Sequence, residues 1–180
     1  MRRFLLGLAI VGGAHAARAQ PPADPEALRH SVEQLRSIVG RWNVETEYLD
    51  DDGSVARAVR GTYDFTWVIL DRVISGKSEI PELQQVAGIL FYVNTAKRII
   101  EMVSVGGDGR LWVMTGPLGG EARTTPPFAT AGGGSAQLRF TRFNVTSDLF
   151  ESRMEYTEDG GQTWKPGNHQ TFRRAPSPAP

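Results

Sequence analysis

The spacing of apolar residues changes once along the chain, and the change separates one helix from a long series of strands. Between positions 25 and 39, apolar side chains recur every three or four residues, at Leu28, Val32, Leu35 and Ile38. This period predicts an amphipathic helix, with Asp24 as its cap and Pro25 as its first residue. From Arg41 onward the period becomes two, and Gly, Asp and Asn clusters separate the runs, which predicts antiparallel strands.

Ten segments carry the strand pattern and are joined mostly by connections short enough for hairpins. The predicted strands are 41–48, 55–69, 72–79, 87–94, 98–105, 110–116, 120–124, 136–145, 149–157 and 163–173. An open sheet of this size leaves two unpaired edges, so we expect an all-β fold closed into an antiparallel meander barrel of eight to ten strands, with one short N-terminal helix. Such a barrel is wide enough to keep a cavity for one small ligand. The irregular connection 125–135 is predicted to be a mobile flap beside the barrel mouth.

The two ends of the chain differ from the barrel segment in composition. Residues 1–19 combine a basic start, an apolar run and a small-residue end, the pattern of a signal peptide, so we expect a periplasmic or secreted protein. A flexible lead-in at 20–25, a barrel domain at 26–174 and a disordered tail at 175–180 complete the predicted organisation. Removal of 1–19 would leave 17 basic against 20 acidic residues, a net charge of about −3. This charge gives no reason to expect a nucleic-acid partner. We also expect no membrane anchor, because the apolar run is shorter than the roughly 20 residues of a spanning helix.

The triplet Gly40-Arg41-Trp42 opens the first predicted strand, and alternation places Trp42 on the inward face with Val44. In this position it resembles the start of lipocalin-like barrels, which implies that the Trp plugs one end. The resemblance also implies an Arg of the last strand on the Trp ring, which Arg173 or Arg174 can supply.

A second motif, Thr157–Trp164, matches the Asp-box of sialidases, which implies a stabilised hairpin and no sialidase activity. Together with Trp42 and Phe172-Arg173, it resembles a group of exported bacterial lipocalin-like (calycin-type) proteins that share no assigned activity. That resemblance implies a fold and a secreted location only.

Large side chains on the predicted inward faces are the candidates for a binding pocket, although each could instead fill the core. The predicted ligand-binding residues are Tyr63, Phe65, Trp67, Tyr92, Met102, Trp112 and Arg142. Arg142 shares the parity of Leu138 and Phe140, which turns it inward if that face is the lumen. An inward Arg favours a carboxylate-bearing ligand or a buried ion pair.

Four functions are compatible with these residues, and binding of a small apolar or amphipathic molecule in the lumen is the favoured one. His169 is the candidate haem ligand, because the nitrobindin family, a ten-stranded lipocalin-like barrel, takes its axial His from about that place. An isomerase or lyase would use Arg142 with Glu101, Glu151 or His169 as proton-exchanging groups. A filled barrel would act through a protein partner instead. We expect no cysteine chemistry, since the chain has no Cys, and no metal site; the oligomeric state stays open.

Overall fold

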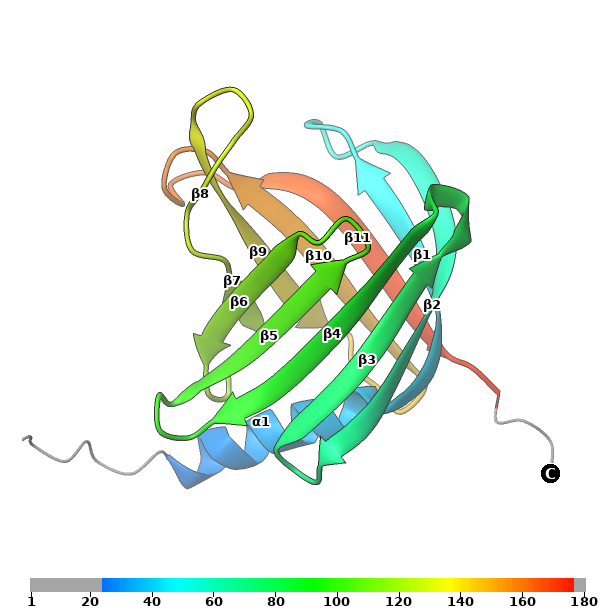
Figure 1. Cartoon of the computed structure of the whole chain (residues 1–180), viewed down its shortest axis with the longest axis vertical. Helices are drawn as coiled ribbons and strands as arrows, with labels where there is room; N and C mark the ends of the chain where they lie inside the picture. The colour runs from blue at the N-terminus through cyan, green and yellow to red at the C-terminus, as the bar shows by residue number, and fades with distance from the viewer. Residues whose placement is uncertain (1–23, 177–180) are drawn as a thin grey trace, which may run out of the picture.

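The computed structural model describes residues 24–176, which form a closed antiparallel barrel of ten strands and one α-helix (Figure 1). The helix is α1 (Pro25–Ile38), and a 3-10 turn, η1, covers Pro81–Leu83. The barrel strands are β1 (Gly40–Leu49), β2 (Val55–Ile69), β3 (Val73–Ile80), β4 (Gln85–Asn94), β5 (Ile99–Gly106), β6 (Leu111–Pro117), β7 (Ala122–Thr124), β9 (Ser135–Phe143), β10 (Leu149–Thr157) and β11 (Lys165–Arg174). Each pairs with the next, and β11 pairs with β1 to close the ring. The predicted all-β meander barrel with one N-terminal helix is confirmed.

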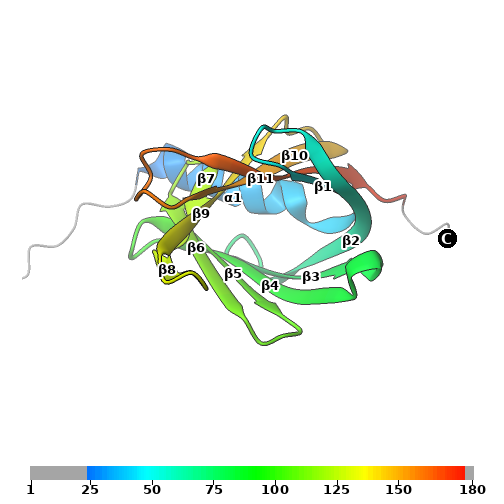
Figure 2. The ribbon, with the colours of Figure 1, turned by 90° about the horizontal axis from the view of Figure 1, so that it is seen from above.

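Helix α1 covers one end of the barrel, which we call the helix end. Its start is capped by Asp24, whose carboxylate accepts a hydrogen bond from the Glu26 amide at 3.1 Å. Its buried face, which includes Leu35 and Ile38, points into the ring of strands. Figure 2 shows the ring from above, with α1 crossing it. The chain leaves the helix through Gly40, whose φ of 116° favours glycine.

Trp42 plugs the helix end. Its side chain is fully buried, its Nε1 donates to the Ile38 carbonyl at 2.8 Å, and its ring meets the Phe150 ring edge-on at 4.9 Å. The guanidinium of Arg174 lies 4.2 Å from the centre of the indole. The structure thus confirms the predicted plug and selects Arg174, because Arg173 alternates to the other face of β11.

The opposite end of the barrel, which we call the hairpin end, carries the β1–β2, β5–β6 and β10–β11 turns (Figure 1). In the β10–β11 turn, Asp159 accepts hydrogen bonds from the Thr163 amide at 3.0 Å, and Gly160 and Gly161 have positive φ. The Trp164 ring packs under Arg139 at 4.1 Å. The Asp-box motif therefore builds a hairpin, as predicted.

The connection 125–135 is more regular than expected. Its short strand β8 (Phe128–Ala129) pairs with the start of β9, and Phe128 meets the Trp112 ring edge-on at 5.0 Å. Thr130 and Gly134 close the turn between the two strands. The rest of the segment is irregular, as predicted, and it lies at the hairpin end (Figure 1).

The predicted signal peptide at 1–19 lies outside the described residues, as do residues 20–23 of the lead-in and 177–180 of the tail. Between residues 24 and 176, no helix has both the length and the apolar character needed to cross a membrane.

Candidate functional site

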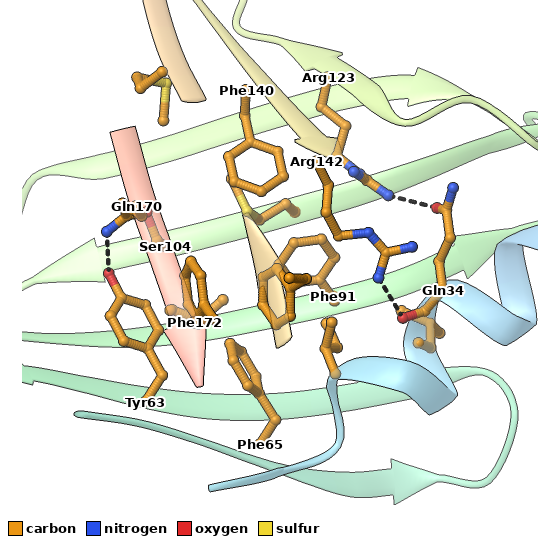
Figure 3. Close-up of a pocket in the computed structure, with 16 residues that line it drawn as sticks. Gln34, Tyr63, Phe65, Phe91, Ser104, Arg123, Phe140, Arg142, Gln170 and Phe172 are labelled. Carbon is orange, nitrogen blue, oxygen red and sulfur yellow. Dashed lines mark hydrogen bonds between the residues drawn. The ribbon is translucent and has the colours of Figure 1, made fainter. Parts of the chain in front are cut away.

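A cavity of about 170 Å³ lies inside the barrel, against the buried face of α1 (Figure 3). Its apolar wall is formed by Leu35, Ile38, Phe65, Ile89, Phe91, Met102, Phe140, Phe150, Met154 and Phe172. Its polar lining consists of Gln34, Tyr63, Ser104, Arg123, Arg142 and Gln170. Cavities of about 150 Å³ accommodate benzene, so this space suits one ring-sized molecule.

Strand alternation brings the aromatic rings of the wall together. Phe150 on β10 stacks on Phe172 of β11 at 4.1 Å, and Tyr63 meets Phe172 edge-on at 5.2 Å. Phe65 meets Phe91 edge-on at 6.5 Å across the sheet. These contacts fix the shape of the apolar wall, because packed rings restrict one another's rotation.

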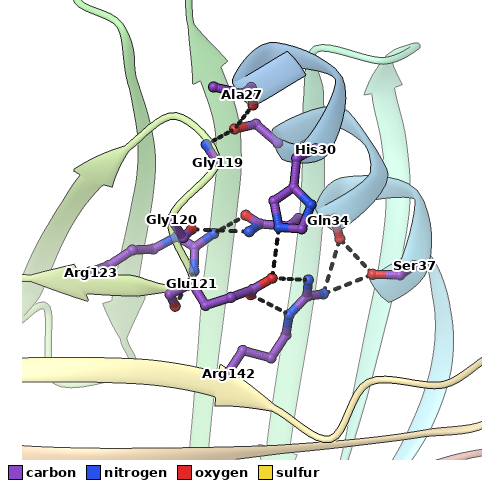
Figure 4. Close-up of polar contacts among 10 residues, drawn as sticks. Ala27, His30, Gln34, Ser37, Gly119, Gly120, Glu121, Arg123 and Arg142 are labelled. Carbon is purple, nitrogen blue, oxygen red and sulfur yellow. Dashed lines mark hydrogen bonds and ion pairs between the residues drawn. The ribbon is translucent and has the colours of Figure 1, made fainter.

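Arg142, predicted to face inward, lies at the helix end of the cavity and is fully engaged (Figure 4). Its side chain is 6% exposed, and its Nε and Nη2 donate to the two carboxylate oxygens of Glu121 at 3.0 and 3.3 Å. Its Nη1 donates to Ser37 Oγ of α1 at 2.7 Å. Burial raises the pKa of Glu121, but hydrogen bonds from Arg142 outweigh it and hold that pKa below the usual value. Arg142 is therefore part of a structural ion pair that ties β9 to the helix.

A second buried arginine, Arg123 of β7, is less completely satisfied. It is 2% exposed, and its Nη2 donates to Gln34 Oε1 at 2.7 Å (Figure 4). Its Nη1 donates to the Glu121 carbonyl at 3.3 Å, and its Nε has no partner among residues 24–176. Burial and the nearby Arg142 lower the pKa of Arg123 to about 10, so the group stays charged at neutral pH.

The structure divides the predicted ligand-binding residues into two groups. Tyr63, Phe65, Met102 and Arg142 line the cavity, whereas Trp67, Tyr92 and Trp112 do not. Trp67 packs against the core beyond the cavity, and Trp112 packs on the β8 hairpin. Tyr92 faces the outside, because its neighbour Phe91 is the residue of β4 that points inward. Its assignment to the lumen is therefore wrong.

The groups expected to bind haem or exchange protons point away from the lumen. His169 lies on the outer side of β11, where its Nδ1 is 3.2 Å from Glu47 Oε2 and its ring stacks on Phe143. Glu151 pairs with Asn144, and Glu101 accepts a hydrogen bond from Asn94. This corrects the expectation that His169, Glu101 or Glu151 could act inside the barrel.

No Asp, Glu or His of the described chain lines the cavity, and residues 24–176 contain no cluster of three metal-binding side chains.

The predicted ligand-binding residues leave out four polar residues of the site: Gln34, Ser104, Arg123 and Gln170. Arg123 lies on a strand of only three residues, which is too short for alternation to reveal its face. Gln34 carries a usable signal, because Ser31, Gln34, Leu35 and Ile38 have the spacing of a single helix face and are all buried. A polar residue within such a stripe marks a place where the helix meets polar groups of the barrel.

Comparisons with known proteins identify the fold and no family. No family model and no curated protein match the chain. Among solved structures, Rv2717c from M. tuberculosis aligns with a TM-score of 0.51 and 9% identity, over 86% of this chain and 99% of that chain.

Two further structures align less well. The S-type phycobiliprotein lyase CPES from Guillardia theta gives a TM-score of 0.49 and 15% identity, over 88% and 100% of the two chains. The structure of EF1p2_mFAP2b bound to DFHBI aligns with a TM-score of 0.40 and 15% identity, over 81% of this chain and 98% of that chain. Since all identities lie below 20%, these likenesses concern architecture alone. The closed antiparallel ring of ten strands with one N-terminal helix fits a lipocalin-like, calycin-type barrel fold.

Proposed function

We propose that this protein is an exported binding protein that holds one small, mainly apolar molecule inside its barrel. The observation that carries the proposal is the cavity of about 170 Å³ bounded by α1. Most of its lining is aromatic or aliphatic, with a few polar groups that can orient a ligand, which is the usual make-up of a small-molecule site.

The physical basis for binding is the removal of apolar ligand surface from water. Each square ångström of apolar surface buried contributes roughly 25 cal/mol. Rings such as Phe65, Phe91 and Phe172 are already held by their neighbours, so a ligand would not have to order them. This favours a site that is formed before the ligand arrives.

The geometry also ranks the alternatives. A filled barrel acting through its outer surface would have no use for a cavity of ligand size next to a charged side chain. An isomerase or lyase would require a proton-exchanging group at the cavity, and its predicted candidates Glu101, Glu151 and His169 face outward. Binding without chemistry is therefore the function that the site supports best.

Two neighbouring residues of β5 provide the test. Ser104 lines the cavity, and Val103 alternates to the other face of the sheet. We expect indole, titrated by calorimetry, to bind the unaltered protein, to lose at least roughly tenfold in affinity in Ser104→Phe, and to bind Val103→Phe normally. Equal binding by both variants would contradict a site in the lumen.

Export is a separate part of the proposal and rests on the pattern of residues 1–19. We expect the protein recovered from its natural host to begin near Gln20 and to occur in the periplasmic or extracellular fraction. N-terminal sequencing and cell fractionation measure both properties. A full-length protein confined to the cytoplasm would refute export and leave lumen binding unaffected.

A further inference from the structure

Arg123 lines the cavity and carries a buried nitrogen that has no hydrogen-bond partner among residues 24–176. A guanidinium carries five N–H donors, and a buried charged group normally has all its donors matched. In Arg123, one Nη2 bond goes to Gln34 and one long Nη1 bond goes to the Glu121 carbonyl. The Nε is buried without an acceptor in the described chain, although the side chain borders open space. Because Nε itself is buried, an acceptor in the cavity reaches it through a shift of the guanidinium toward the open space that the side chain borders.

The charges around Arg123 do not balance. Arg123 and Arg142 are both buried, and the carboxylate that lies nearby is that of Glu121. Arg142 occupies both oxygens of that carboxylate, and His30 of α1 approaches one of them at 3.0 Å. The helix end of the cavity thus carries an uncompensated positive charge, an arrangement that is costly unless an anion joins it.

The surroundings of Arg123 limit what that anion can be. The rings of Phe91 and Phe140 lie 5.3 and 6.0 Å from its guanidinium carbon, and both rings line the cavity (Figure 3). A doubly charged phosphate would lose its hydration among these rings, and of the two arginines that line the cavity Arg142 is already paired with a carboxylate. A carboxylate carries a single charge and has the planar shape that a guanidinium binds best.

We propose that the cavity selects small carboxylic acids in their anionic form, with a carboxylate oxygen accepting a hydrogen bond from Arg123 Nε. The acid's ring-sized or branched apolar body would lie among Phe65, Phe91 and Phe172. This inference rests on the proposed lumen binding and specifies its ligand class. It also sets the orientation: the carboxylate lies beside Arg123, and the apolar body lies against the aromatic wall of the cavity.

Benzoate and benzyl alcohol are suitable probes, because they share a ring and differ in charge. We expect calorimetry at pH 7 to give benzoate at least roughly tenfold higher affinity than benzyl alcohol, the difference made by one charge-assisted hydrogen bond. In Arg123→Met this preference should disappear. The matched control is Arg139→Met on β9, which removes an arginine from the outer face and should keep the preference.

The outcomes separate this inference from the proposed function. If benzoate and benzyl alcohol bind equally well, or if Arg123→Met keeps the preference, the carboxylate inference is wrong and lumen binding stands. In that case a water molecule would be the acceptor for Nε. If neither probe nor indole binds, both proposals fail.

A second measurement covers the case in which Arg123→Met does not fold. Nitrogen–proton NMR spectra of arginine Nε groups in the unaltered protein report on the proposed hydrogen bond directly. Benzoate should shift the Nε–H signal of Arg123 and leave that of Arg139 in place. Absence of that shift at saturating benzoate would overturn the inference.

Discussion

Each end of the barrel contains a tryptophan beneath an arginine, and the two pairs serve different purposes. At the helix end, Arg174 lies 4.2 Å from the Trp42 ring, and Trp42 also contacts Ile38 and Phe150. At the hairpin end, Arg139 lies 4.1 Å from Trp164, which stays within the β10–β11 turn region and is half-buried. The first pair joins the first and last strands of the barrel, whereas the second joins the β10–β11 turn to the neighbouring strand β9.

The hydrogen bonds repeat this contrast. At the helix end, the bond from Arg142 to Ser37 spans 105 residues, and that from Arg123 to Gln34 spans 89. At the hairpin end, most turn bonds span two to four residues, as between Asp159 and Thr163. The bond from the Tyr156 hydroxyl to Asp51 is an exception. Local turns can open without disrupting other strands, so we expect ligands to reach the cavity from the hairpin end.

The largest expected effect comes from removing the two tryptophans in turn. Trp42→Ala should lower the free energy of unfolding by about 3–5 kcal/mol, because a fully buried ring leaves a cavity. Trp164→Ala should cost only about 1 kcal/mol, since its ring is half-buried. Urea unfolding followed by circular dichroism measures both values. Equal losses would show that the hairpin end is as important for global stability as the helix end.

An intermediate effect is expected from the ion pair at the helix end. Arg142 holds the pKa of Glu121 below the ordinary value despite burial. A depressed pKa stabilises the fold above the unfolded-state pKa of about 4.3, and this contribution is lost as pH falls through the folded-state pKa. Glu121→Gln should therefore cost about 1–3 kcal/mol at pH 7 and progressively less below pH 4.

Urea unfolding at several pH values between 3 and 7 measures the free energy of unfolding of Glu121→Gln and of the unaltered protein. The difference between the two should shrink as the pH falls. Glu158→Gln, at an exposed position of the hairpin end, is the control and should change the free energy of unfolding at pH 7 by less than about 0.5 kcal/mol. A constant difference between Glu121→Gln and the unaltered protein at all pH values would contradict the assigned role of the Glu121 carboxylate.

The sequence predicts which residues of a strand face inward only where one face of that strand is apolar and the other is polar. In β1, Trp42 and Val44 alternate with polar residues, and their inward orientation was predictable. In β4, apolar residues occupy both faces, so the period of two has no contrast, and a shift of one residue exchanges Phe91 with Tyr92. The barrel fold was predicted from the number of strands and their short connections. An error about which face of one strand points inward therefore leaves that prediction unchanged.

The polar part of the site was less predictable, for a different reason. Alternation identified Arg142 as inward, but whether an inward arginine is paired depends on Glu121, which precedes β7 in the turn below the helix. The same turn and the three-residue strand β7 bring Arg123 into the cavity. Such placement depends on long-range packing, which local periodicity does not encode. The sequence therefore predicted Arg142, which pairs with Glu121, and missed Arg123, whose Nε has no acceptor among residues 24–176.

The smallest expected effect lies in the hairpin that opposes the helix end. Asp159 accepts bonds from the amide and hydroxyl of Thr163, and these bonds hold the pKa of its carboxyl far below the usual range. In Asp159→Asn the amides of 161–163 should exchange faster with solvent, while the midpoint of urea unfolding stays close to that of the unaltered protein. Hydrogen exchange followed by NMR measures the first property, and a large loss of global stability would contradict the local role. Because the pKa of Asp159 is far below the usual range in the fold, its contribution is complete above the unfolded-state pKa and is lost as the pH falls through the folded-state pKa. The hairpin would then open alone, with Trp42 and the helix end intact, as a route into the cavity requires.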